Sequence, residues 1–415
     1  MKKTFVIIGI LLVVSGAGAY VWQKYKGAAP AVLPPSGNIG NQLPTVTPAS
    51  NAGLPDSVNQ TSIPLTLPKG FTIAVAAKNL SGARVIAQDK LGNLWVSRTG
   101  PGVVTELEIK DGQVVSQSDI FKGLNKPHGL AIDPEDGLTL YIAEENKISK
   151  VRLYKEDGLH KIIDLPKGGR HFTRTLGFGP DGRLYVSIGS TCDVCNEKDE
   201  RYAAIYSMNK DGSDFKKVAT GLRNSAFFTW SYVDGRMWAT EMGRDNLGDD
   251  LPPDEINIIE VGPSTSSGQN SIPNFGWPIC YGNNVHDTNF DKNTYIQNPC
   301  NGKIAPKVEL PAHSAPLGLA FVPEEGWPEA YWYNLIVAFH GSWNRTQPTG
   351  YKLMRIKLDG KGNYLGMEDF ISGWLAKDGK TSLGRPVDVF IMPGGVMYVT
   401  DDKAGVIYKV SYRED

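Results

Sequence analysis

Arginine and histidine residues recur near the beginnings of strand-like segments in this 415-residue sequence. These residues are Arg84, His128, His171 with Arg174, Arg223 with Asn224, and Arg385. If the fold brings them together, the cations surround one site, and burying so many without partners is costly. Such a site favours an anionic ligand, which guanidinium groups bind through paired hydrogen bonds. The alternative is that each arginine pairs locally with an acid, for example Arg385 with Asp388.

The strand-like segments belong to a unit that recurs six times. Each copy has a polar or proline-containing lead-in, an apolar strand, a turn with Asp, Gly or Asn, and a second strand rich in aromatic and β-branched residues. The turn glycines Gly92, Gly137 and Gly182 are spaced by 45 residues, and Gly235 follows after 53. Short antiparallel strands at this spacing, without helical periodicity after residue 66, predict an all-β fold, a six-bladed β-propeller. Two β-sandwich domains, the alternative, would not explain a regular repeat.

A propeller would bring the cationic positions together. The innermost strand of each blade runs along the central channel, so the residues that begin these strands converge on one face near the axis. Loops after the second strands are expected on a neighbouring rim, and they contain Arg98 and residues 241–250, 340–345 and 401–403. A segment of roughly residues 261–312 departs from the repeat, and we expect it to form a loop on one face.

The N-terminal region predicts export. Lys2 and Lys3 precede an apolar run over residues 5–22, which is followed by Lys24 and Lys26. This pattern, over residues 1–26, is typical of a signal peptide or an N-terminal membrane anchor. The run is near the lower limit for spanning a bilayer, and small residues at 17–19 would permit cleavage, so both remain open. We expect an exported protein, periplasmic or otherwise extracytoplasmic, which residues 5–22 would anchor to the inner membrane if they are retained.

Two further regions complete the domain organisation. Residues 27–66 are rich in Pro, Ala, Ser and Thr without apolar periodicity, which predicts a disordered linker. Residues 67–415 form the predicted propeller domain. The formal net charge of −1 gives no electrostatic basis for binding nucleic acid. We expect contact with a membrane only through the N-terminal segment.

The four cysteines are expected to form disulfides, because an even number in an exported chain favours pairing. We expect Cys280–Cys300 to close a long loop and Cys192–Cys195 to form a tight second bridge. The segment CDVCN lacks the histidine that a c-type haem attachment motif has after its second cysteine. The two CxxC pairs of a zinc site are also absent from the sequence.

Several segments closely resemble the soluble quinoprotein sugar dehydrogenases of the glucose/sorbosone dehydrogenase family. They are GRDNLGDDLPPDEIN (243–257), NFGWP (274–278), HSAPLGLAF (313–321), HGSWNRTQPTGYKLMRI (340–356) and GRPVDVF (384–390). The resemblance covers about residues 67–415 and is nearer to the sorbosone dehydrogenase branch. It implies a six-bladed propeller that holds pyrroloquinoline quinone (PQQ) and Ca²⁺ on its axis.

The resemblance also implies an activity. An aldose, or a sugar aldehyde, would be oxidised by hydride transfer to PQQ while Ca²⁺ polarises the quinone and a histidine removes the hydroxyl proton. The three carboxylates of PQQ suit a ring of arginines. Because the sequence shows no haem domain, we expect a separate electron acceptor, a quinone or a cytochrome.

Individual residues match the family's functional positions. His171 matches the catalytic base, and Arg223 with Asn224, in the segment GLRN, matches the cofactor-binding Arg–Asn pair. Gly243 and Arg244 resemble the positions whose backbone carbonyls ligate calcium, an ion that prefers oxygen ligands. Arg385 matches an arginine that clamps the cofactor.

The sequence departs from the family pattern in places. Val387 replaces a second arginine of the glucose dehydrogenase branch, and Arg345 is assigned to the place of a cofactor-contacting lysine. Arg84 and Lys403 are further cofactor-binding candidates, placed by the repeat geometry. The acidic loop could add ligands to the calcium site or simply be solvated, and we expect the second for most of its polar residues, Asp245, Asn246, Asp249 and Asp250.

Two other classes of function remain. A calcium-dependent sugar lactonase would bring Glu, Asp and Asn side chains to the metal and would need no quinone. A binding propeller without catalysis would not depend on His171. The concentration of arginines favours the anionic cofactor over the lactonase.

Overall fold

The computed structural model describes residues 56–261, 272–293 and 295–413. The predicted N-terminal export segment and most of the predicted linker lie outside these residues. Among the residues described, no helix is long and apolar enough to cross a membrane.

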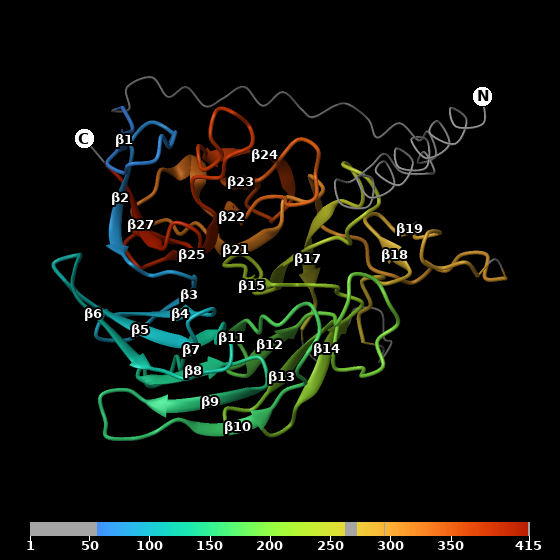
Figure 1. The fold of residues 1–415 in the computed structure, drawn as a ribbon, viewed down its shortest axis with the longest axis horizontal. Helices are drawn as coiled ribbons and strands as arrows, with labels where there is room; N and C mark the ends of the chain where they lie inside the picture. Colours follow the sequence, from blue (N-terminus) through green and yellow to red (C-terminus); the bar gives the residue numbers. More distant parts are fainter. Residues whose placement is uncertain (1–55, 262–271, 294, 414–415) are drawn as a thin grey trace, which may run out of the picture.

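In the described part of the chain, six sheets of four or five strands surround one axis, which confirms the predicted six-bladed β-propeller (Figure 1). Blades are numbered in chain order, and strands run from the axis outward. Blade 1 contains β3 (Ala83–Gln88), β4 (Leu94–Arg98), β5 (Val103–Lys110) and β6 (Gln113–Phe121). Blade 2 contains β7 (Leu130–Ile132), β8 (Thr139–Ala143), β9 (Lys147–Arg152) and β10 (His160–Asp164). Blade 3 contains β11 (Leu176–Phe178), β12 (Leu184–Ile188), β13 (Ala204–Met208) and β14 (Lys216–Thr220).

Blades 4 to 6 complete the ring. Blade 4 contains β15 (Phe227–Trp230), β16 (Met237–Glu241), β17 (Asp254–Ile259) and β20 (Val308–Leu310). Blade 5 contains β21 (Pro316–Phe321), β22 (Leu335–Phe339), β23 (Lys352–Leu358) and β24 (Tyr364–Ile371). Blade 6 contains β25 (Pro386–Ile391), β26 (Met397–Asp401), β27 (Val406–Tyr412), β2 (Phe71–Lys78) and β1 (Val58–Asn59).

Blade 6 joins the two ends of the described chain. Strand β2 pairs antiparallel with β27, with Ile73 opposite Val410, and β1 pairs parallel with the outer side of β2. Because the first and last strands share one sheet, their hydrogen bonds close the ring and stabilise the positions of all innermost strands.

The ordered blade begins before the predicted linker ends. Leu65 is buried, and Thr66 exchanges backbone hydrogen bonds with Ser372. The Asn59 side chain donates hydrogen bonds to the carbonyls of Ile63 and Leu65, 2.8 and 3.1 Å away. These contacts hold residues 56–66 on blade 6. The apolar pattern of this stretch is too sparse to predict such packing.

The repeated turn signature has a local explanation. In blade 1, the Asp89 carboxylate accepts hydrogen bonds from the backbone N–H groups of Leu91 and Asn93, and Gly92 has φ +88°. Aspartate stabilises such a turn, and glycine adopts the positive φ without steric cost. The second strands that follow are buried on both faces; β22, LIVAF, is buried at every residue. This burial explains their aromatic and β-branched composition.

The segment that interrupts the repeat lies within blade 4. It leaves the sheet after β17 and returns as β20, so the predicted insertion of residues 261–312 includes the outermost strand of this blade. The hairpin of β18 (Cys280–Tyr281) and β19 (Val285–His286) belongs to the insertion. Both expected disulfides are present, Cys280–Cys300 here and Cys192–Cys195 in the loop after β12. One short 3-10 helix, η1 (Glu329–Tyr331), precedes β22.

Candidate active site

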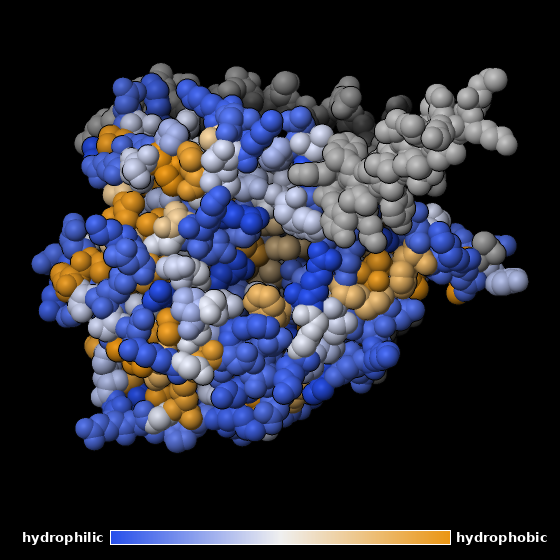
Figure 2. Space-filling view, viewed as in Figure 1, coloured by the Kyte–Doolittle hydropathy of each residue, from blue (hydrophilic) through white to orange (hydrophobic). Residues whose placement is uncertain are grey.

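One end of the propeller carries a cavity of about 290 Å³. Because β3 and β4, and their equivalents, are antiparallel, the beginnings of innermost strands and the loops after second strands meet at the same end. Four arginines, three histidines and two aspartates line the cavity: Arg84, Arg170, Arg223, Arg385, His171, His313, His340, Asp245 and Asp254. Figure 2, drawn from the same side as Figure 1, shows a hollow near the middle of the propeller with mostly hydrophilic residues around it.

The structure separates the predicted site residues into two groups. Arg84, His171, Arg223, Asn224, Gly243 and Arg385 line the cavity. The other three do not line it. Arg244 pairs with Asp287 at 2.7 Å, Arg345 pairs with Asp250 at 2.6 Å, and Lys403 donates to the carbonyl of Ser382 at 2.6 Å.

Two further residues of the cationic set are structural. His128 is fully buried with its ring 5.3 Å from that of Phe227. Arg174 is also fully buried, and its guanidinium donates to the carbonyls of His171 and Pro166, at 2.9 and 3.0 Å. Arg174 therefore supports the backbone that carries His171.

One ring nitrogen of His171, Nδ1, is hydrogen-bonded to Ser190. Its Nδ1 lies 2.9 Å from both the carbonyl oxygen and the hydroxyl oxygen of Ser190. The Ser190 hydroxyl donates its own proton to the Cys192 carbonyl at 2.7 Å, so it can only accept from the imidazole. Nδ1 thus carries the proton, and Nε2 has a free lone pair.

The surroundings of His171 keep the imidazole neutral. Burial, followed by the positive charge of Arg223, lowers the pKa of His171 to about 2. Both effects disfavour the imidazolium form. A neutral imidazole with a free Nε2 lone pair is the form that a general base requires.

Arg223 is fixed by the loop after β12. Its Nε and Nη2 donate to the backbone and side-chain oxygens of Asp193, at 2.8 and 2.7 Å, and its Nη1 donates to the Met242 carbonyl at 3.2 Å. Asp245 lies 3.5 Å from the same guanidinium and 2.6 Å from that of Arg170. Asp245 is buried, so the interpretation of its loop as solvated is wrong at this residue, although Asn246 and Asp250 are exposed.

Among the four arginines of the cavity, Arg84, Arg170 and Arg223 form ion pairs with carboxylates, whereas Arg385 does not in the described residues. Its guanidinium donates to the carbonyls of His340 and Gly341, at 3.1 and 2.5 Å, and within the described residues it forms no ion pair. Asp388, the alternative partner, instead accepts from the backbone N–H groups of Ile86 and Val389. Burial lowers the pKa of Arg385. A partly buried guanidinium whose hydrogen-bond partners are carbonyls favours an anionic ligand.

A mixed charge cluster lies next to Arg385. Arg84 pairs with Asp402 at 2.8 Å, and His340 Nε2 lies 3.0 Å from the same carboxylate. Burial lowers the pKa of His340 to about 4 although Asp402 opposes this effect. His340 is therefore neutral at pH 7, and Asp402 balances the charge of Arg84.

The cavity also offers oxygen atoms suited to a hard cation. Asp254 is buried and accepts hydrogen bonds from the backbone N–H groups of Gly243 and Ala315, both at 2.9 Å. Within the described residues, no hydrogen bond involves the carbonyl oxygens of Gly243 or Arg244. Four arginines suit the carboxylates of an organic anion. The carbonyl of Gly243, which lines the cavity, and that of Arg244, the next residue, suit calcium. The residues present therefore fit both predicted groups.

Comparison with known proteins places the sequence in a family. The family model described as TrAA12-like matches residues 65–413. The chain belongs to the TrAA12-like family. An uncharacterized protein of Borreliella burgdorferi is 33% identical to this TrAA12-like protein over 373 residues, which is 84% of this chain and 91% of the relative.

Two fungal proteins extend the comparison. A PQQ-dependent pyranose dehydrogenase of Coprinopsis cinerea is 24% identical over 332 residues, 70% of the TrAA12-like chain but 44% of that protein. Its PQQ domain in the holo form gives a TM-score of 0.71 at 20% identity, covering 86% of this chain and 100% of that domain. A calcium structure of the Trichoderma reesei AA12 enzyme gives 0.72 at 20% identity, with 86% and 100% covered. These likenesses show the propeller fold.

The sequence did not single out several residues that line the cavity of the TrAA12-like chain. They are Arg170, His313, His340, Trp343 and Asn344. His340, Trp343 and Asn344 lie in the HGSWNR segment after β22, and His313 lies before β21, so the repeat places both loops at the correct end. Arg170 precedes His171 in the sequence, and this adjacency was the feature that could have indicated its place in the cavity.

Gly189 provides a test of the site's packing. A Cβ atom built on Gly189 would lie 2.7 Å from His171 Cβ and 2.8 Å from Asn224 Oδ1, so Gly189→Ala must displace one of them. We expect the rate of the reaction proposed below, sugar oxidation, to fall about 100-fold, because a displacement of about 1 Å can have that effect. Gly158→Ala is the control, since nothing lies within 4 Å of its added atom. Equal rates in both variants would contradict this packing.

Proposed function

We propose that this protein oxidises a sugar, an aldose at its anomeric carbon or a sugar aldehyde, with PQQ as the bound oxidant and Ca²⁺ beside it. The observation that carries the proposal is the meeting, in one cavity, of four arginines and a neutral histidine with a free Nε2. The PQQ-dependent pyranose dehydrogenase among the relatives supports the choice of cofactor. The chain spans less than half of the length of that relative.

The chain's own residues would act as follows. Arg223, Arg385 and Arg84, with Asn224, would bind the carboxylates and polar edge of the quinone, and the carbonyls of Gly243 and Arg244 would hold calcium. When bound, the quinone supplies a hydride acceptor that calcium makes more electrophilic. His171 Nε2 would take the proton of the sugar hydroxyl, and Ser190 would orient the ring from the opposite nitrogen.

Trp343 offers a platform for the sugar. It lines the cavity with 54% of its surface exposed, and the guanidinium of Arg170 lies 5.8 Å from its ring centre. Exposed aromatic rings at pocket mouths can pack against the apolar faces of ligands. We expect Trp343→Ala to raise KM for sugars about tenfold, roughly 1.4 kcal/mol, with a smaller change in kcat, and Trp343→Phe to retain most affinity. A fall in kcat alone would contradict a role in binding the sugar.

Reconstitution tests the proposed function. The purified protein, stripped of metal by a chelator, is titrated with PQQ in the presence and absence of Ca²⁺, and the quinone absorbance and dye reduction are followed with a panel of aldoses and sugar aldehydes. We expect calcium-dependent binding and sugar-dependent dye reduction. Failure to bind PQQ would overturn the proposal, and hydrolysis of a sugar lactone with calcium alone would favour the lactonase class. An external electron acceptor, a quinone or a cytochrome, would replace the dye in the cell.

A further inference from the structure

The loop that carries the Cys192–Cys195 disulfide touches both the candidate base and a cofactor-binding arginine. We propose that this disulfide loop, residues 190–197, is a positioning element that holds the ring of His171 and the guanidinium of Arg223 in their orientations. The inference rests on the proposed function for its catalytic meaning, and the geometry behind it does not depend on any ligand.

The loop reaches His171 through Ser190. The Cys192 carbonyl accepts the Ser190 hydroxyl proton at 2.7 Å, and the Ser190 oxygens then accept from His171 Nδ1 at 2.9 Å. The backbone carbonyl of Cys192, a residue of the disulfide, thereby determines the direction of the Ser190 hydroxyl. The Ser190 carbonyl can only accept, so it keeps the proton on Nδ1, and the oriented hydroxyl adds a second acceptor that holds the ring in place.

The same loop reaches Arg223 through Asp193, the residue next to Cys192. Asp193 accepts two hydrogen bonds from the Arg223 guanidinium, and its carboxylate also accepts the backbone N–H of Asp245 at 2.8 Å. The Ser190 N–H donates to the Arg223 carbonyl at 2.7 Å. One short segment therefore links the base, the arginine and the buried Asp245.

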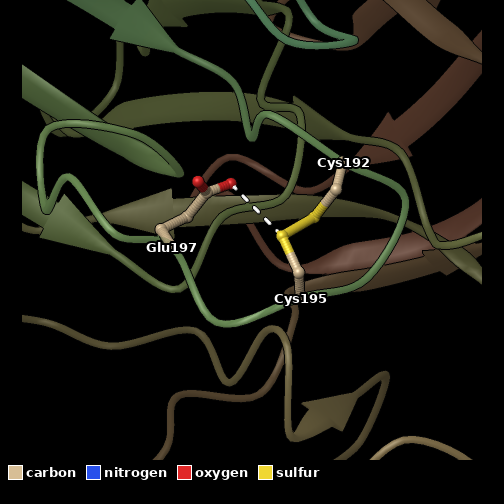
Figure 3. A group of neighbouring side chains, drawn as sticks. All are labelled: Cys192, Cys195 and Glu197. Carbon is tan, nitrogen blue, oxygen red and sulfur yellow. Dashed lines mark hydrogen bonds between the residues drawn. A yellow bond between two sulfur atoms is a disulfide. The ribbon is translucent and has the colours of Figure 1, made fainter.

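The disulfide and hydrogen bonds, rather than burial of side chains, hold this loop. Cys192, Asp193, Val194 and Cys195 are all only partly buried, and Asn196 is exposed. Glu197 accepts from the backbone N–H and the hydroxyl of Thr191, at 2.6 and 2.8 Å, and its carboxylate lies 4.0 Å from Cys195 Sγ (Figure 3). The cysteines and Glu197 lie close enough to hold a metal, but both sulfurs are used in the disulfide. A covalent bridge limits the conformations of such a loop.

The test compares two double variants in the full-length, cofactor-free protein. Cys192→Ser with Cys195→Ser removes the bridge, and Cys280→Ser with Cys300→Ser removes the other disulfide, which lies in the insertion. The ¹⁵N resonances of the His171 ring and of Arg223 Nε report protonation and hydrogen bonding directly. We expect them to shift in the first variant, because the hydrogen bonds to the His171 ring and to Arg223 loosen, and to stay unchanged in the second.

Two further measurements complete the design. Sugar oxidation in the reconstituted first variant should fall about 10- to 100-fold through misplacement of reacting groups. If that variant does not fold, as judged by thermal melting, Ser190→Ala retains the bridge and should shift the His171 resonances in the same direction. Unchanged His171 and Arg223 resonances without the bridge would overturn the inference. An inactive wild-type protein would refute the proposed function alone, because the resonances are measured without PQQ.

Discussion

Replacing His171 with alanine should lower the rate of sugar oxidation by about 10²- to 10⁴-fold, the usual contribution of a general base. The imidazole presents a free Nε2 lone pair to the cavity while Ser190 holds Nδ1, and alanine has no group that could accept the hydroxyl proton. PQQ affinity should change little, because the arginines remain. Stopped-flow measurement of quinone reduction in the calcium-loaded protein separates the chemical step from binding.

His313→Gln is the matched control for His171. His313 lines the same cavity, but its Nε2 lies 2.8 Å from the Gly248 carbonyl, a bond that the glutamine amide can replace. We expect this variant to lose less than about tenfold in rate, since the residue has no role in proton transfer. If His313→Gln is as damaging as His171→Ala, or if His171→Ala retains its rate, His171 is not the base.

The repeat made the fold predictable from sequence. Aspartate-glycine turns and buried second strands are local features, so residues such as Asp89 and Gly92 reveal each blade without knowledge of its neighbours. The repeat also predicted which end of each strand faces the site. Strand β20 was absorbed into the predicted insertion because a strand of only three residues, VEL, has too little pattern to be recognised.

The contacts inside the site could not be predicted in the same way. Which arginines are neutralised depends on partners distant in sequence: Asp402 lies 318 residues from Arg84, and Asp245 lies 75 residues from Arg170. Loop conformation decides these pairs, and the repeat carries no information about loops. Arg345 shows the consequence, because its guanidinium turns to Asp250 outside the cavity while Arg385, predicted by the same resemblance, lines it.

The cofactor should depend strongly on Arg385. Its guanidinium donates to the carbonyls of His340 and Gly341, lies 5.6 Å from the centre of the Tyr351 ring and pairs with no carboxylate in the described chain, so a bound carboxylate would gain a charge-assisted interaction without competition. A hydrogen bond to a charged group contributes about 1.5–3 kcal/mol, so Arg385→Ala should weaken PQQ binding roughly 10- to 150-fold. Equilibrium titration of the quinone absorbance, with calcium held constant, measures this change.

Two variants sharpen the prediction for Arg385. Arg385→Lys retains the charge but loses the planar fork, so its affinity should lie between those of the wild type and Arg385→Ala. Arg345→Ala removes a guanidinium that already pairs with Asp250 outside the cavity, and it should leave PQQ affinity unchanged within about twofold, as is usual for an exposed ion pair. Equal losses in Arg345→Ala and Arg385→Ala would mean that the loop with Asp250 rearranges to bring Arg345 to the cofactor. If only Arg385→Ala loses PQQ affinity, the cofactor's carboxylate is bound by Arg385, the arginine without a carboxylate partner in the described residues.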